Sequence, residues 1–326
     1  MAEVHEVAPD GDVKLICGSE ENENLIHIIV SSVVLSLGSP VFKAMLGAHF
    51  KEGTTLATGA QLELPLPEDS PRAMLAICEV MHMKSVTRAA PSVDQLVKIV
   101  MLVDKYDCRG ALNYAMREWI RCTEEIAPGD MDRLHLFVIA YLMELRQDFS
   151  KFGYHLVGKS SLSFRFDPPN DIPETLQRAI EMLYESRRQA AEEVQRTFER
   201  VISVECAEHE NLPGRCADDC THIAERVFSF ISRLTKTQMW PLTQFTERPL
   251  LDQLIALEDF PSDWAVRIAP CKGQTYCKGI MMSVDMDVAF EVSEFARLMV
   301  AKLPVPCLTC AKEKTMELTE RCNKGH

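Results

Sequence analysis

Apolar and polar residues alternate over short stretches near the start of the chain, as they do in β-strands. Val13–Cys17 and Leu25–Val30 are short apolar runs that follow polar turns, and Leu62–Leu66 alternates before the turn PLPEDSP. Between the last two runs, SLGSPVFKAML at 36–46 has helical spacing, with Pro40 near its first turn, where the missing N–H costs nothing. We therefore expect a small three-stranded sheet with a helix inserted before the third strand.

From Pro71 onward the apolar residues recur every three or four positions, which is the period of a helix. One helix is expected to begin after Ser92, because Ser92 and Gln95 have the spacing of a capping box. An apolar stripe from Leu134 to Phe152 predicts one long helix. Further helices are expected from Pro71 and over 110–121, 173–202, 223–234 and 250–257.

The stretch 173–202 has a second interpretation as a coiled-coil seam. Its residues at alternating steps of four and three are Leu176, Ile180, Leu183, Arg187, Ala190, Val194, Thr197 and Val201. Arg187 and Thr197 are poor seam residues, and Phe198 widens the apolar face. These residues favour packing within the chain over pairing with another helix.

Composition and charge narrow the class of protein. The chain has 326 residues, of which 47% are hydrophobic, enough for a packed core and about two domains. Its net charge of −13 and the lack of a Lys/Arg block argue against nucleic-acid binding. The N-terminal MAEVHEVAPDGD lacks the apolar core of a secretory signal, and the longest apolar run, 28–42, is broken by polar residues. We expect an intracellular protein of the cytoplasm or nucleus, with no membrane or nucleic-acid partner.

Several stretches of the first third of the chain resemble a BTB/POZ domain. DVKLICG at 12–18 resembles its first strand, and 25–53 resembles its second strand, the helix behind it and the following loop. LELPLPED at 62–69 resembles the third strand, and 97–112 the late helix pair, in which DKYDC at 104–108 is similar to fungal members. The expected fold is therefore α+β: a BTB/POZ domain over 12–122, a helical region over 128–268 and a cysteine-rich segment over 269–326.

The resemblance implies a non-enzymatic protein-interaction module. Many BTB proteins bind a cullin scaffold and act as substrate adaptors of a ubiquitin ligase, and these resemble one another in an apolar-x-Glu triplet after the early helix. Phe50-Lys51-Glu52 fits that triplet. An exposed aromatic residue in a loop is also a common hot spot for binding. The alternative is that Phe50 folds back onto the domain while Glu52 is only solvated.

Dimerisation with another BTB chain is the second implied activity. In the family a leading aspartate and a basic residue after the second strand contribute to a charged pocket near the dimer interface. Asp12 matches that aspartate, but Ser31-Ser32 replaces the His-basic pair, and eleven residues precede Asp12. We do not expect dimerisation by exchange of an N-terminal segment. A nuclear transcriptional scaffold acting through BTB dimers is the alternative function.

Cysteine and histidine spacing near the end of the chain is typical of a small zinc site. Cys307 and Cys310 are followed by Cys322 and His326, and thiolates with an imidazole suit Zn²⁺. A looser second set comprises Cys206, Cys216, Cys220, His222, Cys271 and Cys277. We expect the cysteines to be unliganded thiols without a cofactor, and a structural zinc site is the alternative.

Two motifs raise an enzyme alternative. GYHLVGKS at 153–160 has the form of a phosphate-binding loop, which in that role needs a strand before it and a helix after it. Here a helical stripe precedes it, so we expect Gly153 and Gly158 to end that helix and no small-molecule substrate to bind. Cys220 and His222 could form a nucleophilic pair, but no oxyanion-type glycine loop accompanies them.

Overall fold

The chain forms two compact units, Met1–Asp148 and Phe149–His326, in a mixed α+β, mostly helical structure. The computed structural model describes residues 3–18, 25–84, 90–126, 129–165, 172–211, 222–240, 248–258, 290, 292–315 and 322. Within these, side chains are described except at 201–211, 222–227 and 229.

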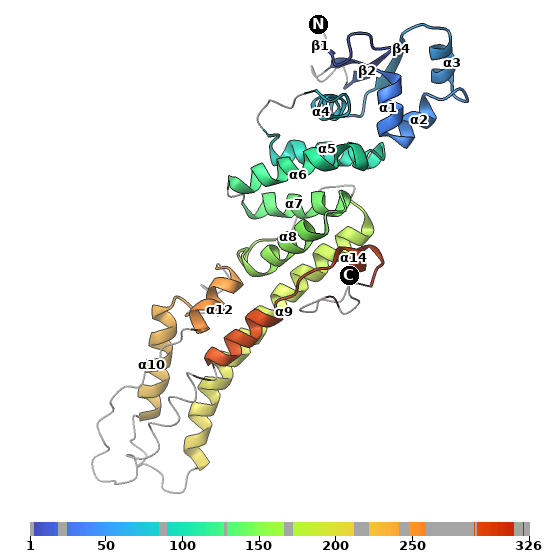
Figure 1. The fold of residues 1–326 in the computed structure, drawn as a ribbon. Helices are drawn as coiled ribbons and strands as arrows, with labels where there is room; N and C mark the ends of the chain where they lie inside the picture. The colour runs from blue at the N-terminus through green and yellow to red at the C-terminus, as the bar shows by residue number, and fades with distance from the viewer. Residues whose placement is uncertain are drawn as a thin grey trace, which may run out of the picture. The chain divides into compact units, whose positions relative to one another are not determined.

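A four-stranded sheet lies in the first unit (Figure 1). Its strands are β1 (Glu3–Glu6), β2 (Val13–Cys17), β3 (Ile26–Val30) and β4 (Leu62–Leu66), in the order β1-β3-β2-β4. β2 is antiparallel to β3 and parallel to β4, while β1 is parallel to β3. In β2 and β3 every second residue is buried, as the alternation predicts.

The three expected strands are thus confirmed, but the expectation of a three-stranded sheet is wrong. The additional strand is β1, whose sequence EVHE is largely exposed at the edge of the sheet. An edge strand of charged and polar residues has no buried face, so it carries no apolar alternation that the sequence could reveal.

Helices cover the sheet in the first unit. They are α1 (Ser32–Gly38), α2 (Pro40–Met45), α3 (Lys51–Ala57), α4 (Pro71–Met81), α5 (Val93–Lys105), α6 (Arg109–Glu125) and α7 (Asp130–Leu142). α4 packs on β3 and α1, and on its other side against α5 and α6. α7 packs against α5 and so lies in the first unit (Figure 1). The expected capping box at Ser92 and Gln95 is confirmed.

Two expected single helices are each divided in the structure. The helix over 36–46 is split at Ser39, whose hydroxyl accepts a hydrogen bond from the Phe42 amide (3.0 Å) and begins α2. The helix over 134–152 is split into α7 and α8 (Arg146–Gly158), with Glu144 at a φ of 59° between them. In both places the apolar spacing continues across the break, so periodicity by itself does not indicate it.

The second unit is helical around the long helix α9 (Glu174–Asn211). The described part of this unit also contains most of α8, α10 (His222–Lys236), α12 (Leu250–Glu258), a helix over 292–302 and α14 (Leu308–Lys312). The seam positions Leu176, Leu183 and Val194 are buried, and the Phe198 ring meets the Phe230 ring of α10 edge to face at 6.5 Å. The face of α9 that resembled a coiled-coil seam therefore packs within its own unit.

Candidate functional site

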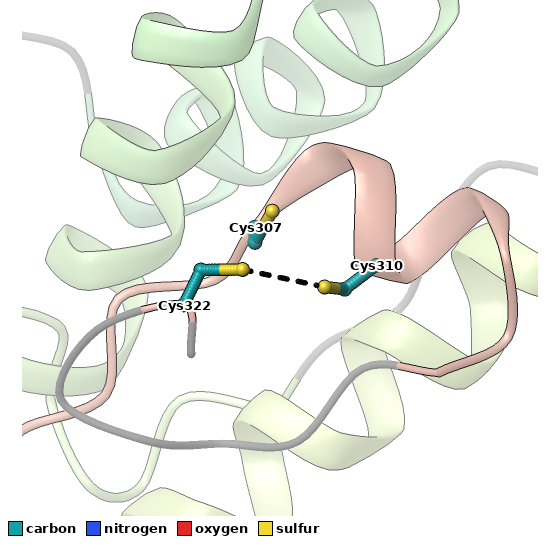
Figure 2. Close-up of side chains that lie close together, drawn as sticks. All are labelled: Cys307, Cys310 and Cys322. Atoms are coloured by element: carbon teal, nitrogen blue, oxygen red, sulfur yellow. Dashed lines mark hydrogen bonds between the residues drawn. The ribbon is translucent and has the colours of Figure 1, made fainter. Parts of the chain in front are cut away.

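Three thiols converge in the second unit. Cys307 immediately precedes α14, Cys310 lies within α14, and Cys322 returns to the same place from beyond the helix (Figure 2). Their sulfur atoms all lie within 4.8 Å of one another, and those of Cys310 and Cys322 are 3.5 Å apart. This arrangement could hold a metal ion. The grouping expected from the spacing of these three cysteines is confirmed, while His326 lies outside the described residues.

The thiol cluster of Cys307, Cys310 and Cys322 rests on a packed support. Leu308 and Ala311 of α14 are buried, and α14 packs against α9. The Ser150 hydroxyl of α8 donates a 2.7 Å hydrogen bond to the Pro306 carbonyl, directly before the cluster. The cluster is therefore fixed to two other helices of its unit.

Protonation governs what the cluster can bind. Burial, followed by hydrogen bonds with the thiols of Cys322 and Cys307, raises the pKa of the Cys310 thiol to about 11. A metal ion binds thiolates, so it must displace these protons. Metal affinity at this cluster will accordingly rise with pH.

The looser set of cysteines and the Cys220–His222 pair cannot be placed in the same way. Cys216, Cys220, Cys271 and Cys277 lie outside the described residues, as do the side chains of Cys206 and His222.

The phosphate-loop motif has the backbone of a helix. Gly153 is buried inside α8, so the expectation that it ends the helix is wrong, whereas Gly158 is the last residue of α8. The amides of Lys159 and Ser160 both donate to the His155 carbonyl. A phosphate cradle needs such amides unpaired, so 153–160 lacks that geometry. A Cβ on Gly158 would be 3.4 Å from Leu251, which indicates a packing role for this glycine.

Phe50 and Glu52 lie at the start of α3 rather than in a loop. Phe50 is the N-cap residue, with 52% of its surface exposed, and Glu52 is half-buried in the first turn. The next residue, Gly53, is held against the preceding turn, because a Cβ there would lie only 2.0 Å from the Gly47 carbonyl oxygen. The Phe50 amide donates to that same oxygen (3.1 Å). Gly53 and Gly47 together fix the position from which Phe50 projects.

Asp12 accepts hydrogen bonds from the first residue of α1. Its two carboxylate oxygens accept from the Ser32 amide (2.7 Å) and the Ser32 hydroxyl (2.6 Å). Burial acts to raise the pKa of Asp12, but the hydrogen bonds from Ser32 outweigh it and leave the pKa lowered. Ser32 thus gives Asp12 a hydrogen-bond partner within the first unit.

His82 supports the same helix end from the other side. Its Nε2 accepts from the Ser31 amide (3.0 Å) and its Nδ1 lies 2.8 Å from the Cys78 carbonyl oxygen, to which it donates as the neutral tautomer. Burial, with a smaller effect of Lys84, lowers the pKa of His82, although the hydrogen bond to the Cys78 carbonyl acts the other way. Protonation of Nε2 would remove the acceptor for Ser31.

We predict a pH-dependent loss of stability from this contact. Because folding lowers the pKa of His82, the unfolded chain takes up a proton first, so the contact stabilises fully above the unfolded value of about 6.5 and is lost as pH falls below it. His82→Gln removes the titration. Between pH 7.5 and 5.5, the protection of the α1 amides, measured by hydrogen exchange and corrected for the pH dependence of intrinsic exchange, should therefore fall less in the variant than in the native chain. His49→Gln, at an exposed position, is the control and should match the native chain; an equal fall in protection in all three would refute the prediction.

A buried polar cluster joins the end of α5 to the turn after β4. Asp69 is 3% exposed, and its carboxylate accepts from the Tyr106 hydroxyl (2.5 Å) and the Lys105 ammonium (2.6 Å). Burial and the Asp69 carboxylate raise the pKa of Tyr106, so its hydroxyl remains a donor. The Tyr106 ring also stacks on Phe42 at 4.4 Å. Lys105 and Tyr106 of DKYDC therefore act in packing.

The surface of the first unit carries several exposed apolar side chains. Val33 and Leu37 lie one turn apart on α1, with Leu37 83% exposed, and Tyr114 of α6 is also exposed. Exposed apolar residues are ordinary when isolated, whereas Val33 and Leu37 are neighbours on one helix face.

No protein-family model matches the chain, and no curated protein is significantly similar to it. Among the described helices, none combines the length and the apolar character needed to cross a bilayer.

Proposed function

We propose that the first unit is a BTB/POZ-type interaction domain and that the chain is a non-enzymatic adaptor. The observation that carries the proposal is the exposed Phe50 ring at the start of α3, with Glu52 in the same helical turn. An aromatic anchor beside a carboxylate is a typical hot spot for a protein partner. The expected order of strands and helices over 12–122 supports the family assignment.

The polar groups of the first unit support the same interpretation. Asp12, His82 and Asp69 each have a hydrogen-bond partner inside the domain. Their roles in capping and packing leave the exposed apolar side chains as the features directed at a partner. We infer that the partner of Phe50 and Glu52 is a cullin scaffold, and that the second unit selects a client for ubiquitin transfer.

Recovery of a cullin with the tagged full-length chain tests this function. Phe50→Ala combined with Glu52→Lys should weaken cullin binding about 30-fold, equivalent to about 2 kcal/mol for a hot spot. Quantitative mass spectrometry of purified complexes measures the loss. Ile126→Ala with Glu125→Lys, also an exposed apolar residue beside a carboxylate, is the matched control and should bind normally. Absence of a cullin with the native chain, or equal recovery with the Phe50/Glu52 variant, would reject the adaptor function.

We also propose that the thiol cluster holds a structural zinc ion, with His326 as the fourth ligand. In a tetrahedral site with Zn–S bonds of about 2.3 Å, neighbouring sulfur atoms are about 3.8 Å apart. The observed separations, 3.5 Å for one pair and no more than 4.8 Å for any, are close to that value. Zinc therefore needs only small movements of the three side chains.

Metal analysis of the purified chain should find about one zinc per molecule. Cys310→Ser should lower this to less than about a tenth, because it removes the central ligand. Cys122→Ser is the control, since Cys122 is a half-buried cysteine of α6 outside the cluster. A native chain without zinc after purification in zinc-containing buffer would end this proposal.

A further inference from the structure

The hydrogen-bonded thiols of Cys310 and Cys322 are placed for a covalent reaction with one another. We propose that this pair is an oxidation site, at which a hydroperoxide forms a Cys310–Cys322 disulfide and expels the metal ion. The expulsion rests on the proposed zinc site, whereas the disulfide rests on the thiol geometry.

The distance and direction of the Cys310 and Cys322 thiols are suitable for a disulfide bond. Figure 2 shows the two sulfur atoms pointing toward each other from opposite sides of the cluster, 3.5 Å apart. A disulfide bond is about 2.05 Å long, so the sulfur atoms must approach by about 1.5 Å. Cys322 follows Cys310 by twelve positions on a separate segment of chain, which lets one side chain advance without distorting α14.

Partial exposure combined with a neighbouring thiol distinguishes the cluster from the other described cysteines. Cys17, Cys78 and Cys108 are buried in the first unit. Cys122 is half-buried, and its sulfur contacts Glu118 and Arg121 rather than a thiol. In the cluster, Cys322 is half-buried and open to a small oxidant, while the buried Cys310 thiol is in contact with it. An oxidised Cys322 therefore has an immediate thiol partner, which prevents its oxidation to the irreversible acids.

The reaction proceeds in two balanced steps. The Cys322 sulfur attacks hydrogen peroxide, the O–O bond breaks, and a sulfenic acid and one water form. The Cys310 sulfur then attacks the sulfenic sulfur, and the second water leaves as the S–S bond forms. In sum, two thiols lose two electrons and two protons, and one peroxide is reduced to two waters. From the metal-bound thiolates, the two protons come from solvent and the metal ion departs.

Zinc and the disulfide are thus alternative links between Cys322 and α14. Either one holds Cys322 against Cys310. After oxidation, Cys307 remains as a thiol beside the disulfide.

The test is a titration of the full-length, zinc-loaded chain with hydrogen peroxide. A colorimetric chelator follows released zinc, and mass spectrometry of tryptic peptides follows the bonds. Trypsin cleavage after Lys302, Lys312, Arg321 and Lys324 places Cys307 and Cys310 on peptide 303–312 and Cys322 on peptide 322–324. We expect one zinc released per disulfide formed, the two peptides joined, and fragmentation that assigns the bond to Cys310. Cys122→Ser should behave like the native chain.

Each other outcome has a distinct meaning. A disulfide within peptide 303–312, a bond from Cys307 to Cys322, or oxidation to sulfinic acid without a disulfide would overturn the assignment. Zinc retained after the 310–322 bond forms would overturn the expulsion step. If the chain never binds zinc, the zinc proposal fails, and the same peptide analysis of the metal-free chain still decides whether the disulfide forms. Cys307→Ser, which keeps the reacting pair, should still give the joined peptides.

Discussion

Replacement of Asp69 by alanine should destabilise the first unit by about 3 kcal/mol. The substitution leaves the buried Tyr106 hydroxyl without its acceptor, which costs about 2–3 kcal/mol. The Lys105 ammonium adds less than about 1 kcal/mol, because the lysine side chain is half-exposed and regains water. Tyr106→Phe removes a single hydrogen bond to a buried carboxylate and should cost about 1.5–3 kcal/mol.

Hydrogen exchange of the full-length chain in increasing urea measures this effect for α5 and the turn after β4. Asp104 lies in the last turn of α5, two residues before Tyr106, and is exposed. Asp104→Ala is therefore the control and should change stability by less than about 0.5 kcal/mol. If Tyr106→Phe were as harmless as Asp104→Ala, the buried cluster would not contribute to stability.

Substitution of Gly53 by alanine should have the second large effect. The new Cβ would meet the Gly47 carbonyl oxygen at 2.0 Å and the Leu46 carbonyl oxygen at 2.7 Å, so backbone must move. Overpacking of this kind costs about 1–3 kcal/mol. Since Phe50 is the N-cap residue of α3, displacement of this helix should also weaken the proposed cullin binding as strongly as the Phe50/Glu52 variant does.

Gly110→Ala provides the control for this substitution. Nothing lies within 4 Å of a Cβ at Gly110, which is in the first turn of α6, so alanine should be neutral or stabilise by up to about 1 kcal/mol. Thermal unfolding and cullin recovery measure the two consequences separately. Normal stability of Gly53→Ala would contradict the structural claim. If Gly53→Ala loses stability but still binds the cullin, α3 would not be part of the surface that binds the partner.

The strands and helices with buried faces were predictable from the sequence. β2 and β3 are short apolar runs of strand length, and α4 and α5 carry apolar residues at helical spacing, so their residue order indicates the elements and their buried positions. β1 has no buried face, and the divisions at Ser39 and Glu144 leave the apolar period undisturbed, so periodicity could not reveal them. A side-chain cap at Ser39 and a left-handed residue at Glu144 are local events that the neighbouring packing selects.

The candidate sites show the same division. The sequence spacing was enough to group Cys307, Cys310 and Cys322, because cysteines close together in the sequence can readily come together around one site. The pairing of Asp69 with Tyr106 could not be predicted, because 37 positions separate them and the packing of α5 against α4, which begins at Pro71, brings them together. The sequence could not reveal the close approach of Gly53 to Gly47, because that contact is with backbone atoms rather than with a side chain.

The edges of the sheet in the first unit bear on how that unit avoids aggregation. β4, at one edge, contains Pro65, which has no amide hydrogen to offer an added strand, and α3 packs against it. β1, at the other edge, is four residues long and begins and ends with glutamate. Short, charged or proline-bearing edges resist pairing with strands of other molecules. We therefore expect copies of the domain to remain separate at high concentration instead of growing edge to edge into fibrils.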